Sequence, residues 1–323
     1  MLRDLLPSFS VVLSPMDDIT TKEYRNICKG FGADVLFSEF VSSDALIRDV
    51  EMSYQKISFT QQERPVGVQI FGNTKEKLVE AAQRVEEQQP DFIDINWGCP
   101  MKKIADKGSG SGILKDIPKM LSITKAVVNS VHIPVSVKTR IAYDDHSIAI
   151  TDFAEGLQDC GIQLLSIHGR TKMQMYNGPA NWTMIGQVKN NQRIKIPIFG
   201  NGDIDSAEKM LEYKNRYGVD GILIGRAAIG KPYIFKQCHQ ILEGEPLFEP
   251  TIKQRAMICK EHFLSMIPNY GEFRAMVIMK KFYSKYFSSI ANFKPFKMQL
   301  MEAKSKNEVI NILNKISDIE YLI

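Results

Sequence analysis

The sequence predicts an α/β fold, a (β/α)8 TIM barrel followed by an all-helical C-terminal domain. Three observations in the chain of 323 residues favour this fold. Eight short apolar runs rich in β-branched residues recur along most of the chain, and helix-length segments lie between several of them. Beyond residue 250 these runs stop, and the sequence becomes helical and basic.

The order of these segments decides between two α/β folds. The strand-like runs cover residues 11–15, 35–40, 66–71, 92–96, 135–139, 164–168, 196–200 and 221–225. The helix-length segments include residues 75–89, 117–129, 148–160 and 206–217. Such alternation predicts parallel strands with helices outside, and eight units over about 240 residues fit a closed barrel. A doubly wound sheet is the competing fold, but no G-x-G-x-x-G turn follows the first run.

Two prolines mark the end of the expected barrel. Pro246 and Pro250 interrupt helix propagation, so we expect a barrel domain over residues 1–243 and a helical domain over residues 251–323. The second segment holds 12 Lys/Arg and 6 Asp/Glu, whereas the rest of the chain is close to neutral. This distribution is typical of an appendage that binds a polyanion, and a solvated lysine face would give the same composition.

A helix is expected over residues 271–287 of the basic segment. Four apolar residues at 3/4 spacing form one face of it: Met276, Met279, Tyr283 and Tyr286. Three basic residues fall within about 40° of one another on a different face: Arg274, Lys281 and Lys285.

Composition limits the class of protein. The hydrophobic fraction is 44%, no apolar run approaches the length of a membrane span, and the first residues lack a long apolar segment. The 5 cysteines show no C-x-x-C pairing, which argues against a disulfide framework and against a zinc or iron–sulfur site. We therefore expect a cytosolic (cytoplasmic) protein with reduced thiols, no metal and no membrane partner.

Cys99 is the most informative residue, because it lies in the turn after the fourth strand-like run. Gly98 and Pro100 break that strand, and Lys102 and Lys103 follow closely. We expect the thiol to be exposed in a cationic field that favours thiolate or proton-donor chemistry. The alternative is a small buried thiol, which is the usual state of a free cysteine.

Ligand-like groups follow the strand-like runs at the ends where barrel enzymes carry their chemistry. In chain order they are Pro15, Met16 and Asp17; Gln69; Asn96; Lys138 and Arg140; His168 and Arg170; Asn201, Gly202 and Asp203; and Gly225 and Arg226. The last two groups are typical of a phosphate pocket, in which glycines let the backbone approach the phosphate and Arg226 adds a charge-assisted bond.

Lys138 indicates the chemistry of the rest of the ligand. A lysine inside a barrel mouth needs an anionic partner, which an isoalloxazine ring becoming anionic on reduction would supply, with Gln69 at the ring edge. A structural Lys–carboxylate pair is the alternative.

Several motifs together carry a resemblance to a known family. They are Pro15-Met16, Val68-Gln-Ile-Phe-Gly72, Asp94-Ile-Asn-Trp-Gly-Cys-Pro100, Val137-Lys-Thr-Arg140, His168-Gly-Arg-Thr171 with Gln174, Tyr176, Gly178 and Trp182, Gly200-Asn-Gly-Asp-Ile204 and Ile224-Gly-Arg-Ala-Ala228. With these motifs the chain resembles the tRNA-dihydrouridine synthase family. Asp17-Asp18 depart from the small residues usual after Pro-Met, and Lys231-Pro-Tyr233 stands where Asn-Pro-Trp is common.

The resemblance implies FMN as cofactor, NADPH as reductant and a uridine in tRNA as substrate. Hydride from flavin N5 would add at C6 of the uracil ring, and Cys99 would donate a proton to C5. Asn96 would orient substrate or flavin, Arg140 would contact the substrate, and His168 would hold the phosphate side of the flavin. General-acid help of this kind is typically worth about 10²- to 10⁴-fold in rate.

A uridine in folded tRNA must be turned out of its stack, so basic residues must hold the backbone. Those expected to do so are Arg170 and Lys172 at the rim, with Arg274, Lys281 and Lys285 on the tail. The alternative for each is an ordinary solvated charge. Two rival functions remain at this point: a flavin barrel acting on a free pyrimidine, as in dihydroorotate or dihydropyrimidine dehydrogenases, and an RNA-binding barrel without cofactor.

Overall fold

A computed structural model describes residues 1–318 and confirms the barrel. Its strands form one parallel sheet in the order β1-β9-β8-β7-β6-β5-β4-β2, with β3 also paired to β4. A parallel bridge between Val12 and Val35 brings β1 back to β2, so the sheet is nearly closed. The strands are β1 (Ser10–Leu13), β2 (Leu36–Phe37), β3 (Val41–Ser42), β4 (Val66–Phe71), β5 (Phe92–Trp97), β6 (Val135–Arg140), β7 (Leu164–His168), β8 (Ile198–Asn201) and β9 (Gly221–Ile224).

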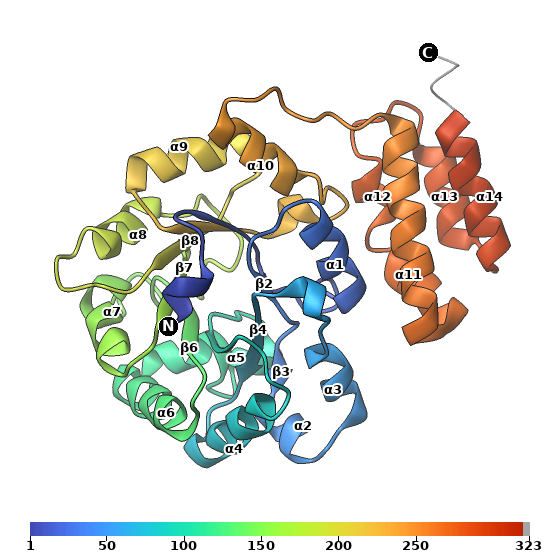
Figure 1. Cartoon of the computed structure of the whole chain (residues 1–323). Coiled ribbons are helices and arrows are strands. Elements are labelled where there is room, and N and C mark those ends of the chain that lie inside the picture. Colours follow the sequence, from blue (N-terminus) through green and yellow to red (C-terminus); the bar gives the residue numbers. More distant parts are fainter. Residues whose placement is uncertain (319–323) are drawn as a thin grey trace.

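Helices surround this ring of strands (Figure 1). Those of the barrel are α1 (Lys22–Gly30), α2 (Ser43–Ile47), α3 (Glu51–Ile57), α4 (Lys75–Glu86), α5 (Lys102–Ala105), α6 (Ile117–Ser130), α7 (Ile150–Asp159), α8 (Trp182–Lys189), α9 (Ala207–Tyr217) and α10 (Ile234–Glu243). Short 3₁₀ turns add η1 (Leu2–Leu5), η2 (Gln61–Glu63), η3 (Gly110–Lys115) and η4 (Arg226–Ala228). Within the described residues, no helix is long and apolar enough to cross a membrane.

One predicted strand is shorter than expected. Of the run over residues 35–40 only Leu36–Phe37 form a strand, β2, and β3 follows beyond the end of the run; both strands pair with β4. Between them the side chain of Ser38 turns toward the neighbouring strand, where its Oγ accepts a hydrogen bond from the backbone N–H of Gln69 at 3.0 Å. The backbone N–H of Ser38 also donates to the carbonyl of Gly67 at 2.9 Å, so Ser38 stays bonded to β4 beyond the end of β2.

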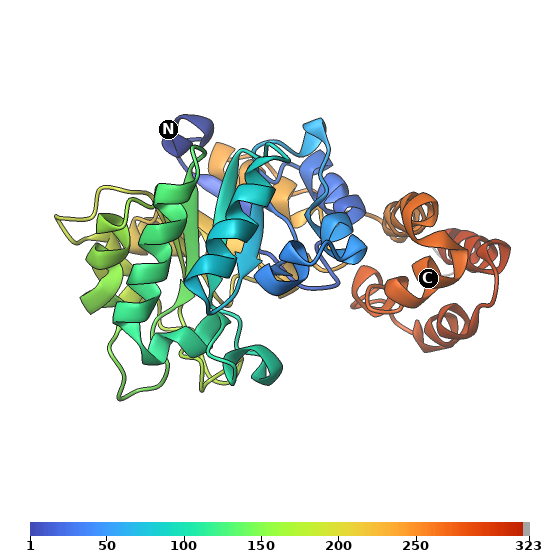
Figure 2. The same cartoon turned by 90° about the horizontal axis from the view of Figure 1, so that it is seen from below.

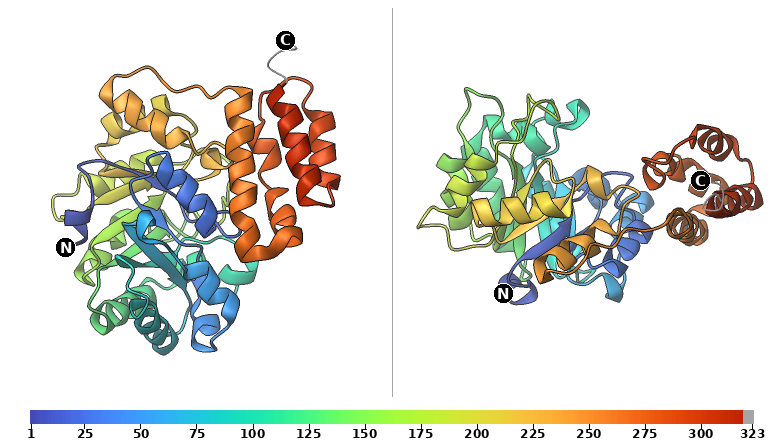
Figure 3. Two further views of the ribbon diagram at one scale, coloured as in Figure 1. Left: turned by 45° about the vertical axis from the view of Figure 1, so that its right-hand side comes forward. Right: turned by 90° about the horizontal axis from the view of Figure 1, so that it is seen from above.

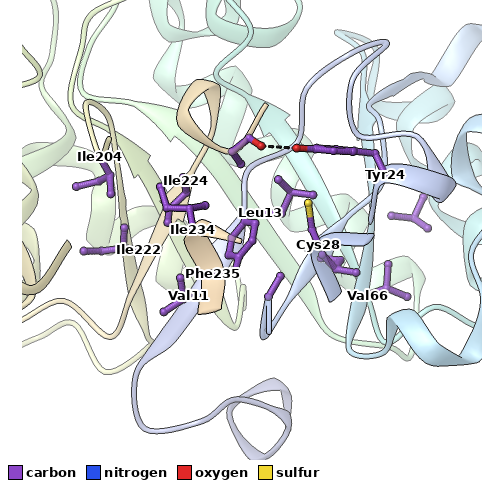
Figure 4. Close-up of a cluster of buried hydrophobic side chains, with 14 of the residues drawn as sticks. Val11, Leu13, Tyr24, Cys28, Val66, Ile204, Ile222, Ile224, Ile234 and Phe235 are labelled. Carbon is purple, nitrogen blue, oxygen red and sulfur yellow. Dashed lines mark hydrogen bonds between the residues drawn. The ribbon is translucent and has the colours of Figure 1, made fainter. Parts of the chain in front are cut away.

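The strands separate two apolar cores. Inside the barrel, Val12, Phe92, Leu164 and Phe199 cluster with Leu2 of η1, which covers the amino-terminal end of the strands. Outside, alternate strand residues pack against the helices, as Figure 4 shows for one such cluster. Toward the carboxyl ends of the strands a cavity is lined by polar side chains instead, among them Gln69, Asn96 and Lys138.

Up to residue 318 the tail folds into helices that lie beside the barrel (Figure 2). They are α11 (Ile252–Met279), α12 (Tyr283–Tyr286), α13 (Lys294–Glu302) and α14 (Lys306–Ser317). α10 ends at Glu243 and α11 begins at Ile252, on either side of the two prolines. That residues 1–243 and 251–323 form two domains stays a prediction, and residues 319–323 of the second lie outside the described residues.

The prediction of one helix over residues 271–287 is wrong. The backbone is non-helical at Gly271 (φ 73°), α11 ends at Met279, and α12 begins only at Tyr283. In the turn between them the buried Phe282 packs its ring 4.6 Å from that of His262. The turn places the four predicted apolar residues in the core as expected, but it separates the basic residues that a continuous helix would align.

A seam of specific contacts joins the tail to α1 (Figure 3). Asn269 donates a hydrogen bond of 2.6 Å to Glu23, and the ring of Tyr24 lies 4.9 Å from that of His262. The hydroxyl of Tyr24 donates to the carbonyl of Ala228, shown as a dashed line in Figure 4. The contacts of Asn269 and His262 with α1 hold the tail against the barrel, and the hydrogen bond from Tyr24 to Ala228 holds α1 in place within the barrel.

Candidate active site

A cavity of about 1020 Å³ opens at the carboxyl ends of the barrel strands. Most of the predicted site residues line it together: Pro15, Met16, Asp17, Gln69, Asn96, Cys99, Lys138, Arg140, His168, Arg170, Asn201, Gly202, Asp203, Gly225, Arg226 and Lys285. Three others lie outside its lining: Lys172, Arg274 and Lys281. The sequence thus located one site, whereas the roles of its residues stay predictions.

Cys99 lines this cavity, but the expectation of an exposed thiol is wrong, because the residue is only 8% exposed. Burial raises the pKa of the Cys99 thiol above its ordinary value, and the nearby Arg140 and Lys138 charges only partly oppose this effect. The side chain therefore faces the cavity as a protonated thiol and not as a thiolate at neutral pH.

Asn96 fixes the turn that carries Cys99. Its Oδ1 accepts hydrogen bonds from the backbone N–H groups of Gly98 at 2.9 Å and Cys99 at 2.8 Å. From the other side, the hydroxyl of Ser111 donates to the carbonyl of Cys99 at 2.8 Å. Gly110 allows this approach, since a Cβ there would lie 2.8 Å from the same carbonyl oxygen. The thiol is thus held by backbone contacts on both sides.

Buried hydrogen bonds to residues of neighbouring strands fix the side chain of Asn96. Its Nδ2 donates to Oε1 of Gln69 at 2.8 Å, and Nε2 of Gln69 donates to Asp94 at 2.6 Å. Asp94 also accepts from Ser136 at 2.5 Å. Burial raises the pKa of Asp94 to about 6, although these two hydrogen bonds oppose the shift. The sequence analysis gave Asp94 no role, yet its carboxyl orients the amide of Gln69.

Lys138 is partly buried, and among residues 1–318 no carboxylate forms an ion pair with its ammonium. Its ammonium donates to Oδ1 of Asn201 at 3.1 Å, and Asn201 in turn donates to the carbonyl of Leu223 at 2.9 Å. Burial and then the Arg140 charge lower the pKa of Lys138 to about 8. The arrangement favours an anion in the cavity over the Lys–carboxylate pair that was the alternative.

Arg140 is almost fully buried and holds the rim loops in place. Its Nε donates to the carbonyl of Gly98, and its Nη1 donates to those of Thr171 and Met175, each at 2.8 Å. Burial lowers the pKa of Arg140 to about 10. Arg140 therefore ties the turn of Cys99 to the loop after β7.

Tyr176 in that loop is a cavity residue to which the sequence analysis gave no role. Its half-exposed ring lies 5.7 Å from the guanidinium of Arg140 and 5.2 Å from that of Arg226. The ring of His168 lies 6.4 Å away. Burial and the neighbouring cations lower the pKa of His168 well below its ordinary value, so this imidazole is neutral.

Arg170, which was expected to hold the RNA backbone at the rim, is buried and paired within the protein, and its role toward RNA stays a prediction. Arg170 is 2% exposed, and its Nη2 donates to both carboxylate oxygens of Asp203 at 2.7 Å. Asp203 also accepts from the backbone N–H of Ala180 at 2.7 Å. Burial opposes ionisation of Asp203, but these hydrogen bonds hold its pKa below the ordinary value. The pair joins the loops after β7 and β8.

The remaining predicted cations do not belong to this network, and they differ in exposure and in their contacts. Arg274 is exposed above the ring of Tyr270, and Lys285 is exposed at the cavity edge. Lys172 is partly buried with its ammonium 5.1 Å from the ring of Tyr143. Lys281 instead pairs with Asp18 of the barrel at 2.9 Å, so part of its charge is already neutralised.

Solved structures share the architecture at low identity. Histamine dehydrogenase from Rhizobium sp. 4-9 aligns with a TM-score of 0.56 at 12% identity, covering 80% of this chain and 48% of its own. Morphinone reductase in complex with tetrahydroNAD aligns with a TM-score of 0.52 at 15% identity, covering 75% and 88%. These likenesses support the barrel fold alone.

Comparison of sequences goes further. The chain is 35% identical over 292 residues to a probable tRNA-dihydrouridine synthase of Rickettsia bellii, covering 90% of this chain and 89% of that protein. It is 36% identical over 290 residues to tRNA-dihydrouridine synthase B of Pseudomonas aeruginosa, covering 90% and 87%. The family model for dihydrouridine synthase (Dus) matches residues 12–320. With its barrel, its cavity and a match over nearly its whole length, the chain belongs to the dihydrouridine synthase family.

Proposed function

We propose that this protein reduces uridines in tRNA to 5,6-dihydrouridine, with FMN as cofactor and NADPH as reductant. The observation that carries the proposal is the position of Cys99 in the lining of a cationic cavity at the carboxyl ends of a parallel barrel, where burial raises the pKa of its thiol. The cavity volume of about 1020 Å³ is at the upper end of what cofactor sites occupy. It therefore has room for a cofactor and a nucleobase together.

The cavity residues fit a flavin mononucleotide. Lys138 offers a partly buried cation to a ring that takes up negative charge on reduction. Asp94 fixes the amide of Gln69, which in this proposal binds the polar edge of that ring. Gly202 has a φ of 126°, and with Gly225 it leaves backbone open to a phosphate, beside the half-exposed guanidinium of Arg226.

Asp203 serves the cofactor indirectly in this proposal. Its carboxylate accepts hydrogen bonds from Arg170 and from the backbone N–H of Ala180. Because the carboxylate is itself an anion, it would repel a phosphate and is not expected to bind one directly. We propose that Asp203 positions the phosphate loop while His168, which is neutral, lies on the phosphate side. Pro15 and Met16 line the same cavity with apolar surface.

When bound and reduced, the flavin would supply the hydride that adds to C6 of uracil. The contribution of the protein is the proton. Cys99 holds it on Sγ, because burial keeps the thiol pKa above neutrality, and delivers it to C5. Asn96 and Ser111 hold the turn so that the sulfur keeps one position.

The charge of the tail supports RNA as the substrate. Residues 251–323 hold 12 Lys/Arg against 6 Asp/Glu. Lys285 extends this charge to the edge of the cavity, and Arg274 is exposed on α11. We propose that these two side chains, with Lys172 on the rim, hold the RNA backbone while the uridine is turned into the cavity.

Replacement of Cys99 by alanine tests the proposal. With unmodified tRNA, NADPH and FMN, Cys99→Ala should retain flavin and oxidise NADPH, but dihydrouridine formation should fall about 10²- to 10⁴-fold because the proton donor is removed. Dihydrouridine is measured by mass spectrometry of digested tRNA. Cys99→Ser is the matched control for volume, and it should also be slow because a hydroxyl is a much weaker acid.

Two outcomes would overturn this proposal. Wild-type amounts of dihydrouridine from Cys99→Ala would remove the thiol from the mechanism. Turnover of free uracil or orotate by the wild-type protein, without turnover of tRNA, would favour the free-pyrimidine function instead.

A further inference from the structure

A second hollow of about 690 Å³ lies beside the catalytic cavity, at the side of the barrel mouth formed by α2, α3 and α5. The two hollows share a wall that includes Asp17, Phe40 and Lys103. We call the second hollow the side groove; its chemistry is set by Phe40, Arg48, Lys56, Phe71, Lys103 and Lys107. None of the functions assigned above uses it.

The side groove carries unpaired positive charge. Both carboxylates in its lining already have cationic partners, since Asp17 pairs with Lys56 and Asp44 pairs with Lys77. The other basic side chains are exposed, and among residues 1–318 they have no hydrogen bond or ion pair: Arg48, Lys103 and Lys107. Such unpaired cations around a hollow favour an anionic ligand.

Aromatic surface accompanies these charges. The rings of Phe40 and Phe71 are partly exposed and meet edge to face, with centroids 5.6 Å apart and planes at 78°. Met52, which is 48% exposed, adds apolar surface to the same lining. Aromatic rings combined with unpaired cations are the surface that single-stranded nucleic acid binds, because bases stack on the rings while phosphates contact the cations.

We propose that the side groove binds the nucleotide adjacent to the reduced uridine in the RNA strand. This inference rests on the proposed function, since a uridine turned into the cavity leaves its neighbour in the chain at the mouth. The shared wall of Asp17, Phe40 and Lys103 makes the side groove the continuous path from that mouth. The neighbouring base stacks on Phe71, and its phosphates contact Arg48 and Lys107.

The distribution of charge favours an RNA strand over the adenylate part of NADPH. Lys285 of the tail lines the cavity, and Lys103 lines both hollows. Cationic groups thus continue from the tail across the cavity into the side groove. A strand of several nucleotides requires such a continuous track, whereas a dinucleotide bound at the flavin does not extend to the tail.

The test compares two double variants of the full-length protein. Arg48→Ala/Lys107→Ala removes two cations from the side groove. Arg3→Ala/Lys195→Ala removes the same charge at the opposite end of the barrel, where Arg3 lies in η1 and Lys195 precedes β8, and both are exposed. Binding of unmodified tRNA transcripts is measured by fluorescence anisotropy across a salt titration, together with the KM for NADPH.

The groove variant is expected to bind tRNA on the order of tenfold more weakly. Its salt slope should fall by about 1.4, or about 0.7 for each phosphate that the protein no longer neutralises. The control variant should keep the wild-type affinity and slope. Phe71→Leu should weaken binding on the order of fivefold with an unchanged salt slope, because stacking involves no counterion release.

Two results would overturn the inference. One is a groove variant whose tRNA affinity and salt slope equal those of the control. The other is a raised KM for NADPH with retained tRNA affinity, which would assign the side groove to the dinucleotide. Failure of the proposed function itself would look different, because the wild-type protein would then form no dihydrouridine in any transcript.

Discussion

Breaking the ion pair between Arg170 and Asp203 should destabilise the protein, because it leaves a buried charge without its partner. The guanidinium side chain of Arg170 is 3% exposed, and Asp203 is 24% exposed. Replacing Asp203 by asparagine leaves the buried cation with amide and carbonyl contacts only. Removal of one partner from a buried pair costs about 3–5 kcal/mol, and partial access of water to Asp203 places the expected loss of stability near about 3 kcal/mol.

A double-mutant cycle isolates the interaction. Arg170→Met/Asp203→Asn removes both charges, so it should be less destabilised than the sum of the single variants, with a coupling of about 2 kcal/mol. Urea unfolding can be followed through the two tryptophans, Trp97 and Trp182, which are both buried. The m-values should stay equal if only the native state is affected.

The dependence on pH has a defined sign. The pKa of Asp203 is held below its ordinary value in the folded protein, so its contribution is fully present above the pKa of an unfolded aspartate. It disappears as pH falls through the lower folded value, and the difference between wild type and Asp203→Asn should shrink there. A coupling below about 0.5 kcal/mol, or a difference that persists at low pH, would refute the reasoning.

Two further predictions concern ligand binding. Lys138 loses its charge as pH rises through about 8, so the affinity for reduced, anionic FMN, measured by anaerobic calorimetry, should fall over that interval in the wild type but not in Lys138→Met; parallel profiles would contradict this. Lys281→Ala should weaken tRNA binding less than Lys285→Ala in the same salt titration, because Asp18 already pairs with Lys281 and such an exposed pair is worth about 0–1 kcal/mol. Equal effects in the two variants would mean that Lys281 contacts the RNA directly.

The barrel could be predicted because its signals are local. β4 and β7 have the bounds that the apolar runs indicate, since each buried parallel strand is a continuous apolar segment between breaking residues. The break in the expected helix over residues 271–287 could not be predicted, because it depends on the residue against which Phe282 packs. That partner is His262, which is brought there only by the folded tail.

The site was predictable in position but not in burial. Strand ends converge in any barrel, so the cavity lining followed from the sequence. The covering of Cys99 depends on η3, which begins at Gly110 and returns Ser111 to the Cys99 carbonyl. Arg170 is likewise buried by a carboxylate on another loop, and no local pattern marks that pairing.

The seam between α1 and α11 has a consequence for how such a protein can change. Asn269 of the tail binds Glu23, and His262 rests on the ring of Tyr24. In a chimera whose tail came from another protein, α1 would lose these contacts unless α1 were exchanged together with the tail. Because α1 directly follows the segment that holds Met16 and Asp17 in the cavity lining, any change in the orientation of the tail would also disturb that wall of the cavity.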